Sequence, residues 1–262
     1  MLNKFQLFDS HFHIIDKQFP LVQNNGYTPE EFTYKDYLDK IATYKLCGGA
    51  IVSGSFQAFD QSYLIYALKL FGPSFVGVTQ LPVTVTDDEI IQLNKHGVRA
   101  VRFNLRRGGS EDVSRLSLMA KRVHELAGWH IELYVDSKDL PDLYDTLIQL
   151  PLVSIDHLGL SKSGLTLLTK LVEKGIRVKA TGFSRVDFDV SSALKQLYST
   201  NPKSLMFGTD LPSTRAPCPY IDNDFMLVVD TLGLDGAKDV LSRNAIEFYK
   251  LHESANKVLQ RA

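Results

Sequence analysis

The sequence predicts an α/β fold, a (β/α)8 TIM barrel formed by a single domain. Short apolar runs alternate with longer amphipathic stretches along the whole chain of 262 residues. This alternation indicates a parallel sheet covered by helices. Eight such units in about 250 residues is the size of a barrel of this kind. The alternative is a doubly wound open sheet, but no G-x-G-x-x-G follows the first apolar run, which disfavours a dinucleotide-binding version.

Each predicted strand is a short apolar run, and each predicted helix is an amphipathic stretch that follows one. The predicted strands are residues 6–12, 50–55, 75–81, 98–105, 130–136, 153–157, 177–181 and 205–209. The predicted helices are residues 34–44, 61–70, 87–95, 114–127, 139–149, 165–173, 191–198 and 222–232. A last helix, near residues 242–251, is expected to close the end of the barrel.

The two faces of the predicted strands support the barrel over the open sheet. In residues 130–136, apolar side chains alternate with polar or ionisable ones, namely Ile131, Leu133 and Val135 against His130, Glu132, Tyr134 and Asp136. An open parallel sheet is buried on both faces and should be apolar on both. Polar residues on one face suit a barrel interior that leads to an active site. Such sites lie at the C-terminal ends of the strands.

Composition narrows the class of protein. The chain has 29 basic and 30 acidic residues, so it lacks the basic excess typical of nucleic-acid binders. It contains two cysteines, Cys47 and Cys218, which disfavours a disulfide framework. No apolar run long enough for a membrane span is present, and residues 1–10 do not resemble a signal peptide. These features predict a cytoplasmic protein without membrane or nucleic-acid partners.

Two histidines end the first predicted strand. His11 and His13 are two residues apart, so both should point to one face, and Asp9 should share that face. Two imidazoles on one face are suited to a metal site or to stabilising an oxyanion. The simpler alternative is a pair of half-exposed strand histidines.

Two more candidates end the sixth and eighth predicted strands. His157 should share a face with Val153 and Ile155 and point into the barrel, whereas Asp156 should point toward the helices. Asp210 lies in Gly-Thr-Asp-Leu-Pro, where it could be a turn residue, a general base or a metal ligand. Because strands one and eight are neighbours in a closed barrel, we expect four side chains to converge: His11, His13, His157 and Asp210. The other histidines, His96, His124, His130 and His252, are expected at the surface.

A basic group forms the second set of candidates. Arg102, Arg106 and Arg107 lie at or after the end of the fourth predicted strand, and Arg185 follows the seventh. Tyr134 lies near the end of the fifth on the barrel face. Guanidinium groups pair with carboxylates, so several at one mouth predict an anionic substrate. One of Arg106 and Arg107 is expected to be a solvated loop residue.

These motifs resemble the amidohydrolase superfamily. The shared features are the HxH ending of strand one, the DHLG ending of strand six, the GTDxP ending of strand eight and the closing Arg-Asn-Ala helix. The chain is most similar to the amidohydrolase-related lactonases, typified by 2-pyrone-4,6-dicarboxylate lactonase, through the Arg-Phe-Asn of strand four. The resemblance spans nearly the whole chain and implies one amidohydrolase-related domain, residues 1–262, with a distorted barrel.

The resemblance implies that the protein opens a carboxylated lactone by attack of water. Asp210 would be the base, His11, His13 and His157 would polarise the carbonyl, and the substrate carboxylates would bind Arg102, Tyr134, Arg185 and Arg106 or Arg107. A two-metal centre is not expected, because strand four offers no lysine and Tyr134 replaces the histidine of strand five. No metal, or a single divalent ion such as zinc held by His11, His13, His157 and Asp210, is expected. The alternatives are a sugar-lactone hydrolase, a zinc-dependent decarboxylase and a binding protein without turnover.

Overall fold

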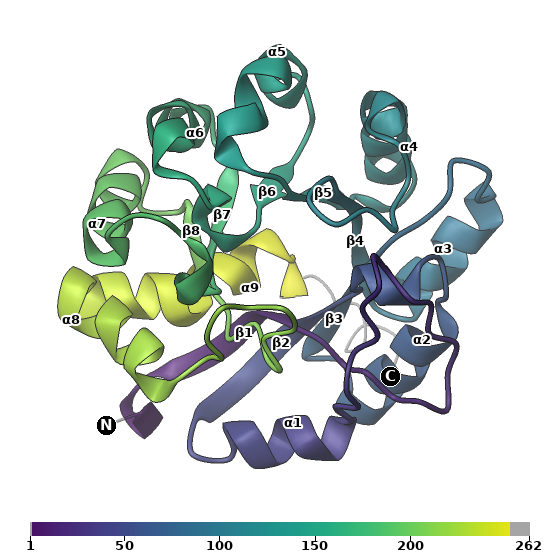
Figure 1. Ribbon diagram of the computed structural model, residues 1–262, viewed down its shortest axis with the longest axis horizontal. Coiled ribbons are helices and arrows are strands. Elements are labelled where there is room, and N and C mark those ends of the chain that lie inside the picture. Colours follow the sequence, from purple (N-terminus) through teal and green to yellow (C-terminus); the bar gives the residue numbers. More distant parts are fainter. Residues whose placement is uncertain (1, 252–262) are drawn as a thin grey trace, which may run out of the picture.

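Eight parallel strands form the centre of the molecule. The computed structural model describes residues 2–251, and its one sheet has the order β1 to β8, each strand paired with the next in sequence. The strands are β1 Gln6–Phe12, β2 Lys45–Val52, β3 Phe75–Thr79, β4 Val98–Asn104, β5 His130–Tyr134, β6 Val153–Ile155, β7 Arg177–Ala180 and β8 Leu205–Phe207. They curve into a ring with helices outside it (Figure 1), which confirms the predicted single-domain (β/α)8 barrel.

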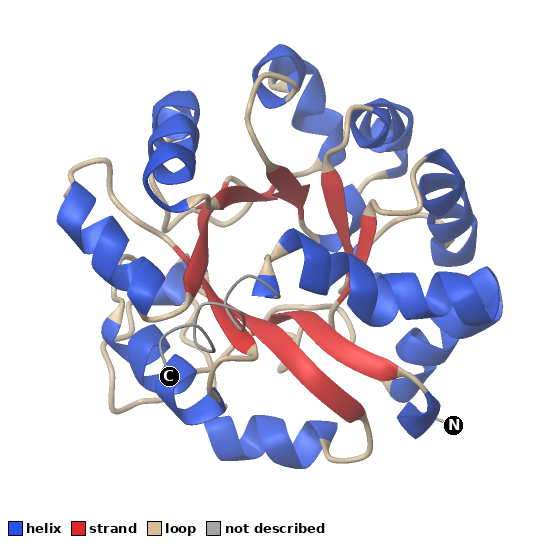
Figure 2. Ribbon diagram, turned by 180° about the vertical axis from the view of Figure 1, so that it is seen from behind, coloured by secondary structure: helices blue, strands red, loops and turns tan. Residues whose placement is uncertain are grey.

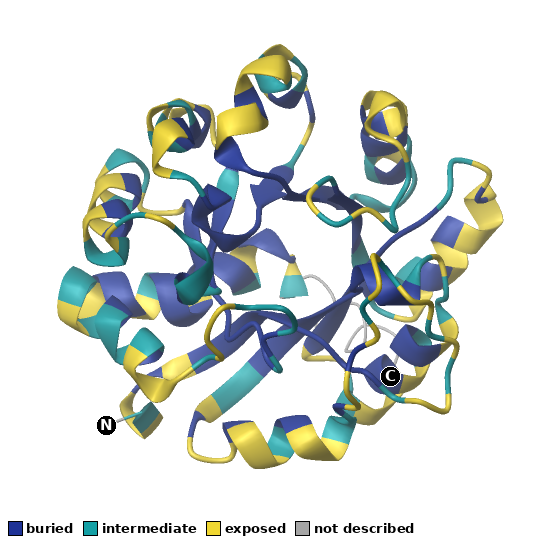
Figure 3. Ribbon diagram, viewed as in Figure 1, coloured by how far each residue is buried: buried dark blue, intermediate teal, exposed yellow. Residues whose placement is uncertain are grey.

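The helices cover the outside of the ring. They are α1 Tyr34–Ile41, α2 Ser62–Phe71, α3 Asp87–Lys95, α4 Leu116–Ala127, α5 Tyr144–Leu147, α6 Leu165–Glu173, α7 Val190–Thr200, α8 Asp222–Lys238 and α9 Asn244–Phe248. The strands are buried throughout most of their length, whereas the outer faces of the helices are exposed (Figure 3). No helix in the described range is long and apolar enough to cross a membrane.

Several elements differ from their sequence-based boundaries, and two of these differences have a clear physical cause. β2 begins at Lys45, well before the predicted residue 50, and includes Gly48 and Gly49. A Cβ at Gly49 would lie 2.9 Å from the Asp9 carbonyl oxygen, so glycine allows the close approach of β1 there. The predicted helix 139–149 is divided between a 3-10 segment, Ser137–Asp142, which contains Pro141, and the four-residue α5. Proline has no N–H for an α-helical hydrogen bond, which accounts for the short α5.

β1 contains a bulge that changes which residues face the interior. Asp9 pairs with Gly49 and Phe12 with Ile51, so β1 uses one residue more than β2 over this stretch. The Asp9 carboxylate accepts hydrogen bonds from Thr209 and from Tyr37 of α1. The expectation that Asp9 shares a face with both histidines is therefore wrong, because the bulge interrupts the period-two alternation.

The barrel is closed between β1 and the residues that follow β8, and this closure is called the seam. The Asp210 N–H donates to the His11 carbonyl at 2.7 Å, and the His13 N–H donates to the Leu211 carbonyl at 2.8 Å. These bonds tie the ends of the first and last strands together at the mouth. The sequence-based expectation that both strands deliver their residues to one place depends on this seam.

The C-terminal segment closes the opposite end of the barrel. A π-helical turn, Asp239–Arg243, leads into α9, which lies across that end in the view from behind (Figure 2). Phe248 and Tyr249 belong to an interior apolar cluster whose other members lie on strands or in α9, namely Phe8, Ala50, Val52, Val76, Val78, Ala100, Met206 and Ala245. The expected closing helix is confirmed, and it leaves the mouth as the open end.

Candidate active site

The bulge in β1 directs two histidines to the mouth. The His11 side chain is fully buried, and His13 is 4% exposed. His13 Nδ1 lies 2.7 Å from the Val52 carbonyl oxygen, which only accepts, so Nδ1 carries a proton and donates. In the tautomer with this proton, the lone pair lies on Nε2. That nitrogen lies 3.7 Å from Asp210 Oδ1.

The end of β6 turns sharply and contributes two side chains. Asp156 follows the last strand residue, and its Oδ1 lies 3.4 Å from His11 Nδ1. His157 then adopts φ 51°, and its ring centroid lies 4.9 Å from that of His11. The prediction that Asp156 points toward the helices is wrong. Val153 and Ile155 belong to the outer core, so Asp156 takes the inward position and the left-handed backbone turns His157 in as well.

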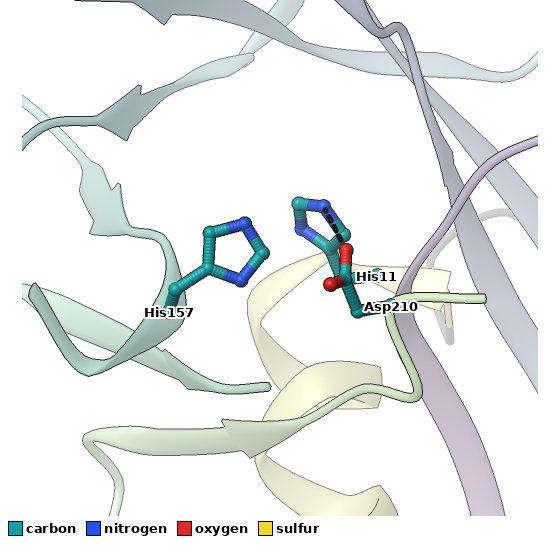
Figure 4. A group of neighbouring side chains, drawn as sticks. All are labelled: His11, His157 and Asp210. Atoms are coloured by element: carbon teal, nitrogen blue, oxygen red, sulfur yellow. Dashed lines mark ion pairs between the residues drawn. The ribbon is translucent and has the colours of Figure 1, made fainter. Parts of the chain in front are cut away.

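Asp210 places one carboxylate oxygen among the histidines. Its Oδ1 lies 3.8 Å from His11 Nε2 and has no hydrogen-bond partner in the described part of the chain. Its Oδ2 accepts from Arg185 Nε at 2.9 Å and Nη2 at 2.7 Å. Figure 4 shows this carboxylate beside the His11 ring, with the His157 ring close by on the other side of His11. The structure thus brings His11, His13, His157 and Asp210 together, as the sequence predicts.

A polar pocket opens above this group. Its lining residues are His13, Gly54, Ser55, Phe56, Arg102, Asn104, Arg107, Tyr134, His157, Arg185, Asp210, Thr214 and Arg215. His11 is not among them and lies deeper. Of the two neighbouring loop arginines, Arg107 lines the pocket, whereas Arg106 is exposed and does not. Arg215 is a further lining residue that sequence reasoning missed.

Arg102 is held by a buried carboxylate. Its Nε and Nη2 donate to Asp156 Oδ2 at 3.0 and 2.7 Å, and its Nη1 donates to the Ser53 carbonyl at 2.9 Å. The guanidinium lies over the Tyr134 ring, 5.3 Å from its centroid. This inward arginine therefore has the partner that burial of a charge requires.

Burial and ion pairing fix the charges at the site. Burial lowers the pKa of His11 to about 4, against the opposing effect of Asp156, and it also lowers the pKa of His157. Both imidazoles are therefore neutral near pH 7. Burial alone would raise the pKa of Asp210, but Arg185 and the neighbouring histidines together outweigh it, and the pKa is lowered. Asp210 is therefore ionised, with Oδ1 free to accept a proton.

A second ionic group lies deeper in the barrel. Lys179 Nζ lies 2.5 Å from Glu132 Oε2, and both side chains are fully buried. Glu132 Oε1 accepts from the Tyr249 hydroxyl at 2.6 Å and lies 3.2 Å from His130 Nε2. The expectation that His130 is a surface residue is wrong, because the strand begins inside the barrel, where α9 covers it. His252 lies outside the described residues.

Three of the four predicted metal ligands are arranged to hold one ion. His11, His157 and Asp210 each offer an atom within 4.8 Å of the others. Among residues 2–251, the buried atoms without a hydrogen-bond partner include both His11 nitrogens, His157 Nδ1 and Asp210 Oδ1. This donor set fits a single divalent ion such as zinc. His13 is tied to the Val52 carbonyl instead. A second trio, His11, Glu132 and Asp156, shares His11 with the first, and its two carboxylates do not line the pocket.

The chain is similar to known hydrolases. It is 30% identical over 162 residues to a 2-pyrone-4,6-dicarboxylate hydrolase of Comamonas testosteroni, covering 58% of this chain and 51% of that protein. It is 26% identical over 225 residues to a 4-sulfomuconolactone hydrolase of Rhizobium radiobacter, covering 78% of this chain and 75% of that protein. The chain thus spans about half the length of the first of these relatives and three quarters of the second.

Solved structures share the fold over nearly the whole chain. A probable 2-pyrone-4,6-dicarboxylic acid hydrolase of Acinetobacter baumannii superposes with a TM-score of 0.80 at 20% identity, covering 93% of this chain and 99% of that one. A Pseudomonas putida protein for which the same activity is proposed gives 0.79 at 25% identity, covering 96% and 98%. The family model described as amidohydrolase matches residues 8–251. The chain therefore belongs to the amidohydrolase family.

Proposed function

We propose that the protein hydrolyses the ring ester of a small lactone that carries carboxylate groups, of the 2-pyrone-4,6-dicarboxylate kind. The observation that carries the proposal is the Asp210 carboxylate. One of its oxygens is held by Arg185 and the other faces two histidines, at the floor of a pocket lined by four arginines. The names of the two curated relatives, both lactone hydrolases, support it.

The geometry supports attack by water activated at Asp210. A water molecule can donate one hydrogen bond to Asp210 Oδ1 and another to the lone pair of His13 Nε2, which lie 3.7 Å apart. As the water oxygen bonds to the lactone carbonyl carbon, its proton passes to Asp210. The ring C–O bond then breaks, and the departing ring oxygen takes that proton. The products are an open-chain acid and regenerated Asp210.

The histidines polarise the carbonyl that is attacked. His157 lines the pocket, and its neutral ring can donate one N–H to the developing oxyanion. A divalent ion held by His11, His157 and Asp210 would supply the same polarisation as a Lewis acid. Arg102, Arg185, Tyr134 and Arg107 line the same pocket and orient the substrate carboxylates.

A panel of lactones tests the proposal. The purified protein is given 2-pyrone-4,6-dicarboxylate, a muconolactone and a neutral sugar lactone, with acid release and CO2 release followed in parallel. We expect the carboxylated lactones to release acid, and we expect no release of CO2 from any of them. Preference for the sugar lactone would favour a sugar-lactone hydrolase, and CO2 release would favour a decarboxylase. Ligand binding without turnover of any compound would refute an enzymatic role.

A further inference from the structure

Four arginines line the pocket, but only two of them are neutralised. Arg102 pairs with Asp156 and Arg185 with Asp210, and both carboxylates are buried. Arg107 and Arg215 have no carboxylate within 4.0 Å among the residues that the structure describes. The net positive charge of the pocket therefore comes from the latter two.

Arg215 is fixed in place by groups that do not cancel its charge. Its Nη2 donates to Ser55 Oγ at 2.7 Å, and its Nη1 donates to Asn24 Oδ1 at 3.1 Å. The guanidinium lies 4.5 Å from the centroid of the Tyr27 ring. Arg215 also adopts φ 56°, a backbone conformation that non-glycine residues seldom take. Neutral partners and a strained backbone together hold a charged group toward the pocket, which is typical of a preorganised binding site.

Arg107 lines the same pocket as Arg215, and its backbone is linked to Arg215 through Asn24. The Asn24 side-chain amide donates to the Arg107 carbonyl at 3.2 Å, while its oxygen accepts from Arg215. Burial and then the positive charge of Arg107 lower the pKa of the Arg215 guanidinium. Two like charges held near each other repel, and an anion bound between them relieves that repulsion.

We propose that Arg215, together with Arg107, forms a subsite for a second anionic group of the substrate, away from the carbonyl that is attacked at Asp210. The pair makes the site selective for dianionic over monoanionic ring compounds. This inference rests on the proposed function for the identity of the reacting ring, but the subsite itself is a matter of binding. Arg102 and Arg185 are less suited to this selection, because each already has a buried counter-charge.

Binding of compounds that cannot be hydrolysed tests the subsite without turnover. Isophthalate carries two carboxylates on a planar ring and benzoate carries one, and calorimetry gives the Kd of each. We expect isophthalate to bind the wild type at least about tenfold more tightly, since a charge-assisted contact corresponds to roughly 10–150-fold in affinity. In Arg215→Met this preference should largely disappear, with benzoate affinity almost unchanged.

Two further variants separate charge from local structure. Ser55→Ala removes one support of Arg215 but keeps its charge, and should retain most of the preference for isophthalate. Arg107→Met should reduce that preference as Arg215→Met does. Arg115→Met is the control, because Arg115 is exposed, lies outside the pocket and changes the net charge equally. Circular dichroism establishes that each variant is folded.

The outcomes distinguish this inference from the proposed function. Equal affinity of the wild type for isophthalate and benzoate would overturn the subsite, even if lactones are hydrolysed. Loss of both ligands to the same extent in Arg215→Met and in Ser55→Ala would also overturn it, since a structural role would then account for the effect. Selective isophthalate binding without hydrolysis of any lactone would support the subsite and refute the lactonase.

Discussion

Replacing Lys179 with methionine should destabilise the barrel by leaving a buried carboxylate without its cation. In the structure Lys179 Nζ lies 2.5 Å from Glu132 Oε2, with both side chains fully buried. The hydrogen bond from Tyr249 remains in the variant but does not neutralise the charge. Breaking a buried pair in this way costs about 3–5 kcal/mol. For a protein of this size, that lowers Tm by roughly 6–20 °C.

The pH dependence gives a second, independent readout. In the wild type, burial alone would raise the pKa of Glu132, but Lys179 and His130 together lower it below its usual value. Glu132 therefore contributes stability above its unfolded pKa of 4.5 and loses it only as pH falls below that value. In Lys179→Met burial dominates, so the pKa rises above the unfolded value and folding binds a proton. The variant should then regain stability relative to the wild type between pH 8 and pH 5.

Thermal unfolding at pH 8 and pH 5 measures both effects. Lys203→Met is the matched control, because Lys203 forms an ion pair of similar length, 2.6 Å, with Glu247 at the surface, where both side chains are more than half exposed. Such pairs contribute about 0–1 kcal/mol. The double variant Glu132→Gln/Lys179→Met should recover part of the loss. If Lys179→Met unfolds at the temperature of the Lys203→Met control at pH 8, the reasoning is refuted.

Three further predictions concern the mouth. Asp210→Asn should keep the fold and lower lactone hydrolysis by at least about 100-fold, the scale of a lost general base; near-wild-type turnover would exclude that role. Arg102→Met should lower stability by roughly 3–5 kcal/mol as well as weaken carboxylate binding, since Asp156 loses its partner, and denaturant unfolding measures this. Prolonged dialysis against a chelator should leave lactone hydrolysis intact with at most one metal ion per chain; activity that vanishes and returns with zinc would contradict this.

The barrel and the convergence of the mouth residues could be predicted from the sequence because both follow from regular repeats. Alternation of strands and helices implies the closed sheet, and closure brings the end of β1 beside the end of β8. His11, His13 and Asp210 meet there for that reason. These inferences need only the order of the elements, so errors in their boundaries did not affect them.

The orientations that failed lie where the backbone departs from regular strand geometry. The bulge in β1 turns Asp9 away from the histidines. His157 has a left-handed backbone conformation, and the side chains of Asp156 and His157 therefore both face inward. Period-two alternation allows only one of them to do so. Alternation over residues 130–136 did place Glu132 inside. A buried carboxylate requires a cation, so an inward-facing Glu132 could have indicated that Lys179 also faces the interior.

Arg215 could not be found by pattern because it lies in an irregular loop after β8. Its role follows from how charge is distributed along the barrel axis. Deep in the barrel Lys179 neutralises Glu132, above it Arg102 neutralises Asp156, and at the floor of the pocket Arg185 neutralises Asp210.

Each of these buried cations has a counter-ion, so the interior offers an arriving anion little net attraction. Among the described residues, positive charge without a carboxylate partner remains toward the rim of the pocket at Arg107 and Arg215, and both residues are partly exposed. A dianionic ring would therefore be oriented by its remote acidic group at the rim, with its carbonyl directed down toward Asp210. A monoanionic ring has no such second contact and can bind in either direction. We therefore expect a monoanionic lactone to show a lower kcat as well as a higher KM than a dianionic one.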